Sequence, residues 1–380
     1  MKKDINQDEN PFEEYKRESD PSKRERSYAW YTAIGLQAVD GLKTSDYLKE
    51  TAVKNIEGEI TISEAQSLIE SYYKTDRKKA EPRTEEADKV SSRITAIIAE
   101  KGFTFSVAQY LSIHRRLFEG IYKYAGKIRD YNITKEEWVL GGDTVIYGGW
   151  TELRATLDYD IAEEKAFDYS GLSMDEVIRH LARFISRLWQ IHVFGEGNTR
   201  TTAVFFIKYL QTLGFDVTND IFAKNAWYFR NAMVRANYND LKKGIHETTE
   251  FLELFLRNLL LGENNPLQNR TLHISGALKQ DSESTKQDFD EAKQDSVDIK
   301  RDFDRLINAG ISVRATNNIL KLIKRFGFST PFGRMDIARE LGITKSPASE
   351  ILSKLLSIGA VAPAKEAGKG KYIFNSHFFE

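Results

Sequence analysis

The chain has 380 residues, of which 41% are hydrophobic and 29% charged, and its formal net charge is -1. This length exceeds one typical domain, and this balance is typical of a soluble globular protein, so we expect two or three domains. Cysteine is absent, which excludes disulfides, cysteine nucleophiles and cysteine-based zinc sites. No apolar run reaches membrane-spanning length, and the first residues lack the apolar core of a signal peptide. We therefore expect a cytoplasmic protein without membrane contact.

Apolar residues recur at helical spacing over most of the chain up to residue 265, which predicts a mainly α-helical protein. The clearest start signal is Ser173 with Glu176 three residues later, a capping box that opens an apolar stripe. The helices predicted from this spacing cover 45–58, 63–74, 104–122, 174–191, 198–214 and 248–262.

Residues 127–149, KIRDYNITKEEWVLGGDTVIYGG, interrupt this helical pattern. Thr, Val, Tyr and Trp are frequent there and surround a Gly-Gly pair, a composition typical of strands joined by a turn. We therefore expect a β-hairpin, or flap, between the helices.

A seven-residue repeat begins at Lys279 and runs through KQDSEST, KQDFDEA, KQDSVDI and KRDFDRL. Its apolar seam is thin, which favours a solvated, charged helix that spaces two domains; a coiled-coil contact is the alternative. The predicted parts are an N-terminal arm with a helical region, a helical core, this charged linker and a C-terminal domain, at 1–90, 91–265, 266–309 and 310–380.

The C-terminal part is basic, with eleven lysines and arginines against five acids from Ser312 to Glu380, a net charge of +6. A helix, a glycine-containing turn and a second helix precede APAKEAGKGKYIF, a candidate β-wing, and the whole resembles a winged helix-turn-helix. If this part binds DNA, Lys345 and Ser346 at the start of the second helix are best placed to reach it. A protein-docking surface is the alternative.

The segment IHVFGEGNTRTTAVFF, residues 191–206, has the features of an anion-binding loop. One helix ends near His192 and another begins near Asn198, and the first amides of a helix are free to bind an anion. Gly195 and Gly197 allow the backbone to approach a ligand closely.

Three side chains of this loop can carry chemistry. Arg200 lies in the first turn of the second helix, where its guanidinium can reach a phosphate. Glu196 offers the hard oxygen that Mg²⁺ on a nucleotide requires, and His192 is able to exchange a proton near neutral pH. A capping histidine and a solvated loop acid are the ordinary alternatives, but the combination predicts a site for transfer of a phosphate-containing group.

The run HVFGEGNTR resembles the signature of the Fic family, H-x-F-x-[DE]-G-N-x-R-x-x-R, and LFEGIYKYAGKIRDYNITK resembles the approach to that family's flap. The resemblance extends over residues 40–265 and implies a Fic-type helical bundle with a β-hairpin flap, followed here by the small winged-helix domain. Most Fic proteins transfer AMP from ATP to a hydroxyl of a target protein. Val193, Thr199 and Ala203 depart from the pattern, and Ala203 replaces its second arginine.

The resemblance implies a role for each matching residue. His192 would deprotonate the target hydroxyl, and Glu196 would hold Mg²⁺. The residues that would hold the phosphates are Gly195, Gly197, Asn198, Thr199 and Arg200. Because the missing second arginine grips the terminal phosphate of ATP in the family, the nucleotide can bind more weakly here or in another pose.

Residues 52–59, AVKNIEGE, resemble the inhibitory helix motif of one Fic class, [ST]-x-x-x-E-[GN], with Val53 at the Ser/Thr position. Glu57 would then occupy the γ-phosphate position and inhibit transfer, although its partner in the family is the arginine that Ala203 replaces. An exposed acid at a helix end, just before Gly58, is the alternative.

Two further segments resemble binding regions of Fic proteins. In YFRNAMVRANYND, which resembles the lining of the adenine pocket, Phe229 would pack on the base and Asn237 would hydrogen-bond it; helix packing and capping are equally open. The flap would dock an extended segment of the target through Val145, Ile146 and Tyr147.

Three functions follow as hypotheses. The first is a protein adenylyltransferase that uses ATP and Mg²⁺, modifies an unknown target protein and is inhibited by Glu57. The second is a Fic-fold phosphotransferase or another nucleotidyltransferase. The third is a regulator that senses nucleotide through its Fic module and binds DNA through residues 310–380. A homo-oligomer is compatible with each.

Overall fold

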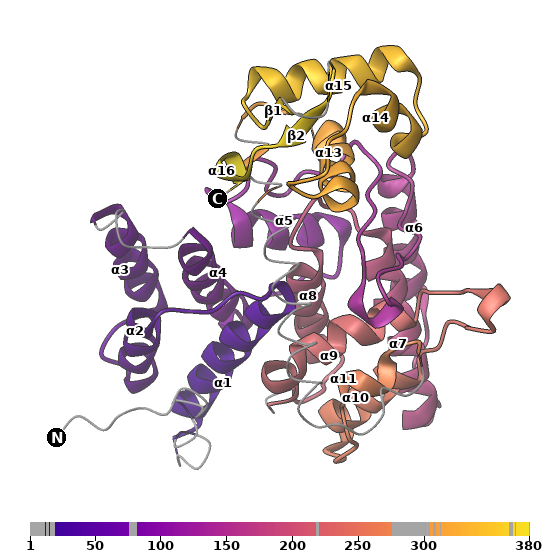
Figure 1. Cartoon of the computed structure of the whole chain (residues 1–380). Coiled ribbons are helices and arrows are strands. Elements are labelled where there is room, and N and C mark those ends of the chain that lie inside the picture. Colours follow the sequence, from indigo (N-terminus) through magenta and orange to yellow (C-terminus); the bar gives the residue numbers. More distant parts are fainter. Residues whose placement is uncertain are drawn as a thin grey trace. The chain divides into compact units, whose positions relative to one another are not determined.

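The computed structural model describes residues 12, 15, 20–75, 82–217, 220–275, 302, 305–306, 309–311, 313–364, 368 and 370–379. The chain divides into two compact units, residues 1–282 and 283–380. Helices dominate the described part of both units (Figure 1), which confirms the predicted mainly α fold class. Within that part, no helix is long and apolar enough to cross a membrane.

The described residues of the first unit contain all the helices predicted up to residue 265, together with five that the spacing did not predict, α1, α4, α6, α9 and α11. Three short 3-10 helices, η2, η3 and η4, lie between them. The bounds are α1 Pro21–Gly35, η2 Leu36–Asp40, α2 Asp46–Glu57, α3 Ile62–Thr75, α4 Pro82–Ala99, α5 Val107–Phe118, η3 Trp138–Leu140, α6 Leu153–Ala166, α7 Met174–Ile191, α8 Asn198–Thr212, α9 Ile221–Arg235, η4 Leu241–Lys243, α10 Glu250–Leu261 and α11 Asn269–Leu272.

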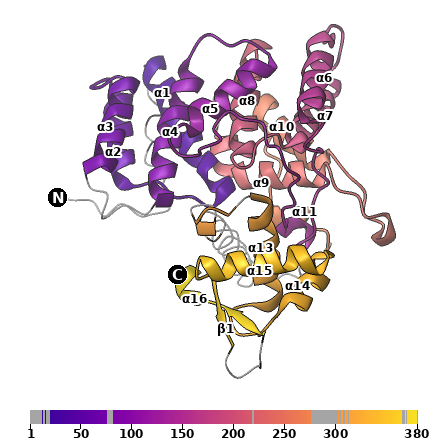
Figure 2. The same ribbon diagram turned by 90° about the horizontal axis from the view of Figure 1, so that it is seen from above.

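Helix α8 is the central helix of this unit. All its residues from Asn198 to Leu210 are buried, as expected of a helix that lacks a continuous polar face. It packs against α4, α5, α7 and η2. Helix α2 packs on α1, and α3 packs on α4; both lie on the side of those helices that faces away from α8 (Figures 1 and 2).

The predicted β-hairpin is not formed, because residues 127–149 contain η3 but no strand. Glu137 N–H donates to Asp143 O at 2.9 Å and closes the tip. Beyond the tip, Gly148 N–H donates to Gln190 O at 3.3 Å, near the end of α7, and not to the opposite arm. High β-propensity reports side chains that fit a half-buried surface, and here that surface is provided largely by helices.

The second unit has its own core around Phe332, Leu355 and Phe374. Strands β1 and β2 pair antiparallel, and Phe332 forms a further bridge with Tyr372. Two helices and two strands follow one another in the predicted order, α14, α15, β1 and β2, while α13 and α16 were not predicted, and the winged-helix assignment stays a prediction. The bounds are α13 Val313–Phe326, α14 Arg334–Leu341, α15 Lys345–Ser357, β1 Val361–Pro363, β2 Tyr372–Phe374 and α16 Ser376–Phe379. Lys345 and Ser346 are exposed at the start of α15, and their contact with DNA stays a prediction.

The heptad-like repeat of the predicted linker lies outside the described residues, except for Asp302, Arg305 and Leu306. The bounds of the four predicted parts stay predictions. The division between the two compact units falls inside the predicted linker, at residues 282 and 283.

Candidate active site

The loop 192–197 joins α7 to α8 and carries the motif. His192 ends α7 with a φ of 51°, the only positive φ of a non-glycine residue in the described part of the chain. Helix α8 begins after Gly197, and its first helical bond runs from Thr201 N–H to Gly197 O at 3.0 Å. The three preceding amides of α8 therefore have no acceptor within the helix, as an anion-binding helix start requires.

Asn198 and Thr199 use their side chains to hold the loop. Asn198 Oδ1 accepts from Phe194 N–H at 3.0 Å, and its Nδ2 donates to Phe194 O at 2.8 Å. Thr199 Oγ1 accepts from Trp189 Nε1 at 3.0 Å. The predicted phosphate contact of these two residues is thereby left to their backbone amides.

Two glycines are required by close neighbours. A Cβ on Gly195 would lie 2.5 Å from Tyr131 Oη, and one on Gly197 would lie 2.4 Å from the ring of Phe118. Gly197 also has a φ of 75°, which residues with side chains rarely adopt. Both glycines are therefore needed for packing inside the protein, and the predicted approach of a ligand to their backbone stays a prediction.

His114, on α5, contacts the loop through its ring and through one hydrogen bond. Its ring stacks on Phe194 with centroids 3.7 Å apart. Its Nδ1 accepts from Gly126 N–H at 2.8 Å, so Nε2 carries the proton and donates to Glu196 O at 3.0 Å. Burial lowers the pKa of His114 to about 3, which keeps the imidazole neutral in this role.

His192 has the properties of a general base. It is 3% exposed, and its Nδ1 lies 3.3 Å from Trp189 O, an acceptor, so that nitrogen carries the proton. Its Nε2 has no hydrogen-bond partner in the part of the chain that the structure describes. Burial first, and then the charges of Lys135, Arg129 and Arg230, lower the pKa of His192 well below its ordinary value. The imidazole is therefore neutral, with its lone pair on Nε2.

Tyr147 of the flap lies against His192, with ring centroids 4.3 Å apart. Its hydroxyl donates to Glu137 at 3.0 Å, and Glu137, fully buried, pairs with Arg230 of α9 at 2.6 Å. The side chain of Tyr147 therefore covers the base, and the docking of a target by this residue stays a prediction. Val145 is buried as well, because alternate side chains of an extended segment point to opposite sides.

Ile146, between these two buried residues, is 85% exposed. Its carbonyl accepts from Gln190 Nε2 at 3.0 Å, which ties the flap to α7. Of the three flap residues predicted to meet a target, Ile146 is therefore the one available at the surface.

Arg129 links the flap to the motif loop. Its guanidinium donates to His192 O at 2.7 Å and to Gly148 O at 2.6 Å, and it also donates to Tyr131 O and Ile191 O. Its backbone N–H donates to Val193 O at 2.9 Å. The unusual backbone of His192 and both ends of the flap are thus held by one buried side chain.

Arg200 does not face a ligand. Its side chain is fully buried, and its guanidinium pairs with Asp40 of η2 and with Glu86 of α4, each at 2.7 Å. It also donates to Gln37 at 3.0 Å and to Tyr122 at 3.2 Å. Burial opposes its charge, but these carboxylates outweigh burial and raise the pKa of Arg200. The predicted phosphate contact is corrected: every part of the guanidinium is already engaged inside the protein.

Glu196 keeps a partly accessible carboxylate, and its Oε2 lies 3.2 Å from Lys135 Nζ on the flap. No group of three or more His, Asp or Glu side chains suited to a metal occurs among the described residues. Mg²⁺ on a nucleotide commonly takes one or two carboxylates, with phosphates and water as the other ligands. Glu196 alone fits that requirement, with Lys135 as the group that Mg²⁺ would displace.

Comparison with known proteins identifies the family of one domain. The model of the Fic/DOC family matches residues 104–210. These residues are a Fic/DOC domain. A curated relative from Sinorhizobium fredii (strain NBRC 101917 / NGR234), named "Probable protein adenylyltransferase y4lH", is 28% identical over 137 residues, which are 35% of this chain and 66% of the relative. The match thus spans just under two thirds of that relative.

Two solved structures are also similar. The N-terminal FIC domain of Bep8 protein from Bartonella sp. 1-1C is 17% identical with a TM-score of 0.37, over 49% of this chain and 88% of that chain. A Fic family protein from Desulfovibrio desulfuricans G20 is 11% identical with a TM-score of 0.37, over 92% of this chain and 87% of that chain.

Glu57 is not beside the loop of the Fic/DOC domain. It ends α2 and pairs with Lys23 of α1 at 2.7 Å. A hydrogen bond from Lys23 and a second from Tyr15 lower the pKa of Glu57. Because α2 lies on the side of α1 that faces away from α8 (Figures 1 and 2), the expected position of Glu57 near a γ-phosphate is not found. Arg200, the first arginine of the motif, pairs with Asp40 and Glu86.

The two predicted adenine-pocket residues have structural roles. Phe229 is fully buried and packs with Phe222 and Phe255 at centroid distances of 5.1 and 5.0 Å. Asn237 Nδ2 donates to Ser186 O at 3.0 Å and to Met233 O at 2.8 Å. The ring of Phe229 therefore belongs to the core, and the amide of Asn237 bonds to the last turn of α9 and to α7, so these roles replace the predicted contacts with a base.

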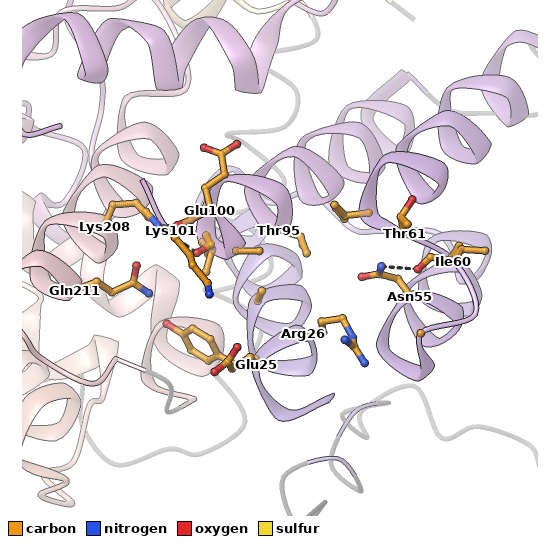
Figure 3. A pocket seen from close by; sticks show the side chains of 16 residues that line it. Glu25, Arg26, Asn55, Ile60, Thr61, Thr95, Glu100, Lys101, Lys208 and Gln211 are labelled. Atoms are coloured by element: carbon orange, nitrogen blue, oxygen red, sulfur yellow. Dashed lines mark hydrogen bonds between the residues drawn. The ribbon is translucent and has the colours of Figure 1, made fainter. Parts of the chain in front are cut away.

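A pocket of about 700 Å³ lies apart from the motif loop, between α1, α2, α4 and α8 (Figure 3). Its polar side chains are largely used within the protein. Lys208 Nζ donates to Ile98 O at 3.3 Å and to Glu100 O, and Arg26 donates to Ile56 O at 2.7 Å. The Asn55 amide donates to Ile60 O at 2.9 Å (Figure 3). These three side chains are therefore committed to backbone carbonyls of the surrounding helices and loops.

Three residues that contact the motif loop were not identified as site residues from the sequence: His114, Arg129 and Lys135. A polar residue on the apolar face of 104–122 was a usable signal for His114. No comparable signal marked the other two, because lysine and arginine in a segment rich in charge are usually solvated.

Proposed function

We propose that this protein is an adenylyltransferase that transfers AMP from ATP to a hydroxyl of a protein target. The Fic/DOC domain supports a transferase activity. The relative named a probable protein adenylyltransferase supports AMP as the transferred group. The observation that carries the proposal is the buried Nε2 of His192, which has no hydrogen-bond partner among the described residues and belongs to the loop that leads to the first amides of α8.

In the proposed step, the target hydroxyl oxygen attacks the α-phosphorus of ATP and forms a new P–O bond. The bond from that phosphorus to the bridging oxygen breaks, and pyrophosphate leaves with the electron pair. The hydroxyl proton passes to His192 Nε2, which is neutral and has no hydrogen-bond partner among the described residues. The α8 amides stabilise phosphate charge, and Mg²⁺ held by Glu196 would neutralise the leaving group.

Ile146 is the flap residue that best supports target docking, because it is exposed while its neighbours are buried. An extended segment of the target would lie along this part of the flap. The proposal leaves the identity of the target open.

The decisive test compares wild type and His192→Ala with ATP and Mg²⁺. Transfer should be lost in the variant, because no other base replaces Nε2, while ATP affinity stays within about threefold, because His192 is not a phosphate contact. Calorimetric titration measures the binding, and intact-mass spectrometry measures the transferred group. Equal loss of ATP binding would contradict the role of His192 as the base.

A phosphotransferase is the second candidate, and one observation favours it. Neither arginine position of the motif reaches the phosphates here, since Arg200 is engaged and Ala203 is buried. A changed nucleotide pose can place a different phosphorus before the attacking hydroxyl. A modification with the mass of phosphate, in place of AMP, would establish this alternative.

A further inference from the structure

Binding of a nucleoside triphosphate brings several negative charges to the motif loop. The start of α8 supplies partial positive charge, but the loop itself supplies no free cation: Arg200 is fully engaged with Asp40 and Glu86, and position 203 is a buried alanine. If the proposed function holds, a cation from another element must face the phosphates.

Three cations lie close enough to His192 to lower its pKa: Lys135, Arg129 and Arg230. Two of them are committed. Arg129 donates to four backbone carbonyls, and Arg230 forms a two-pronged pair with the fully buried Glu137 at 2.6 and 3.0 Å. Breaking either arrangement would leave buried polar groups without partners.

Lys135 differs from both. Its ammonium is partly accessible, at 27% of the side chain, and its described partner is Glu196 of the loop at 3.2 Å, itself 22% accessible. An accessible Lys–Glu pair contributes little to stability and is readily exchanged for another partner. Meanwhile its backbone is fixed, because Lys135 N–H donates to Thr144 Oγ1 across the flap at 3.3 Å. The ammonium therefore stays beside Glu196 of the motif loop and is able to change its partner.

We propose that Lys135 is the phosphate-binding cation of this site and supplies from the flap the charge that the motif arginines do not. When nucleotide enters, its ammonium moves from the Glu196 carboxylate to a phosphate oxygen. Glu196 is then released to accept Mg²⁺. One lysine thus couples nucleotide binding to the availability of the carboxylate.

The test is calorimetric titration of the full chain with ATP and with adenosine, in the presence of Mg²⁺. Lys135→Ala should weaken ATP about tenfold or more, the usual effect of losing one charge-assisted hydrogen bond, and should leave adenosine within about twofold of wild type. Its ATP affinity should also depend less on salt. Lys135→Arg, which keeps the charge, should stay within about threefold of wild type.

Lys127→Ala is the matched control, because Lys127 is an exposed lysine of the same segment and its removal changes the net charge equally. Unchanged ATP affinity in Lys135→Ala, or an equal loss in Lys127→Ala, would overturn the inference and leave the proposed function standing. A loss for ATP and adenosine alike would also overturn it, since that pattern indicates a collapsed site. Failure of wild type to bind ATP would instead overturn the proposed function.

Discussion

Replacing Arg200 should destabilise the first unit strongly, and this separates a structural arginine from a ligand-binding one. Arg200→Met keeps much of the apolar stem and removes the charge. In the structure, the change leaves Glu86, 9% accessible, and Asp40, 23% accessible, without their shared cation. Removal of one partner from a buried ion pair costs about 3–5 kcal/mol. We expect the lower part of this range, because Asp40 is partly solvated.

Urea unfolding followed by tryptophan fluorescence measures this loss. The five tryptophans all lie between residues 30 and 227, so the signal reports the first unit alone. Arg154→Ala is the control, since Arg154 forms an exposed pair with Asp158 and its loss should cost less than about 1 kcal/mol. Adding Glu86→Gln to Arg200→Met should recover part of the stability, because it removes one of the stranded charges.

The opposite pattern would refute this reasoning. If Arg200 were a phosphate ligand, its removal would leave the free energy of unfolding unchanged or slightly higher, and ATP affinity would fall steeply. A midpoint shift equivalent to less than about 1 kcal/mol, with an unchanged urea slope, would show that the buried pairs are not needed by the fold.

Two further predictions concern histidines. Tyr147→Phe should raise the rate at which diethyl pyrocarbonate modifies His192 about tenfold relative to exposed His246. The variant loses a hydrogen bond to a buried carboxylate, worth about 1.5–3 kcal/mol, that keeps the ring over the imidazole. Peptide mass spectrometry measures the rate, and an unchanged rate would show that Tyr147 does not cover His192. His114→Phe should cost about 2 kcal/mol at pH 8, and this difference should shrink as pH falls from 6.5 toward 3. His114 has a pKa of about 3 in the folded state, so over that interval the wild-type unfolded state binds the additional proton and wild type alone loses the stability; a difference independent of pH in urea unfolding would contradict this.

Local signals in the sequence predicted the helices well. The capping box at Ser173 and Glu176 and the apolar stripe after it gave the start and end of α7, because both depend on residues within a few positions. The loop after α7 was predicted for the same reason. The flap was not: its valines and aromatic residues indicated strands, but Val145 and Tyr147 pack into the core formed by helices.

Distant partners explain the errors at the site itself. The sequence places Arg200 in the first turn of a helix, where a phosphate is a reasonable partner. Its actual partners Gln37 and Glu86 come 163 and 114 residues earlier, and no local pattern pairs them with the loop. Glu57 was favoured as the regulatory acid by its motif alone, while Asp40 and Glu86 belong to no motif.

The residues that match the Fic/DOC family therefore include the motif loop but not all the residues that hold it in place. Residues 104–210 contain Arg200 and lack Asp40 and Glu86, its counter-ions. They also contain Glu137 but not Arg230, which pairs with it beneath Tyr147. A buried charge without its partner costs several kcal/mol, so the motif loop takes this conformation only when η2, α4 and α9 are packed around it. A substitution in η2 or α4 should consequently change the position of His192 by way of the loop, although the substituted residue does not itself contact a substrate.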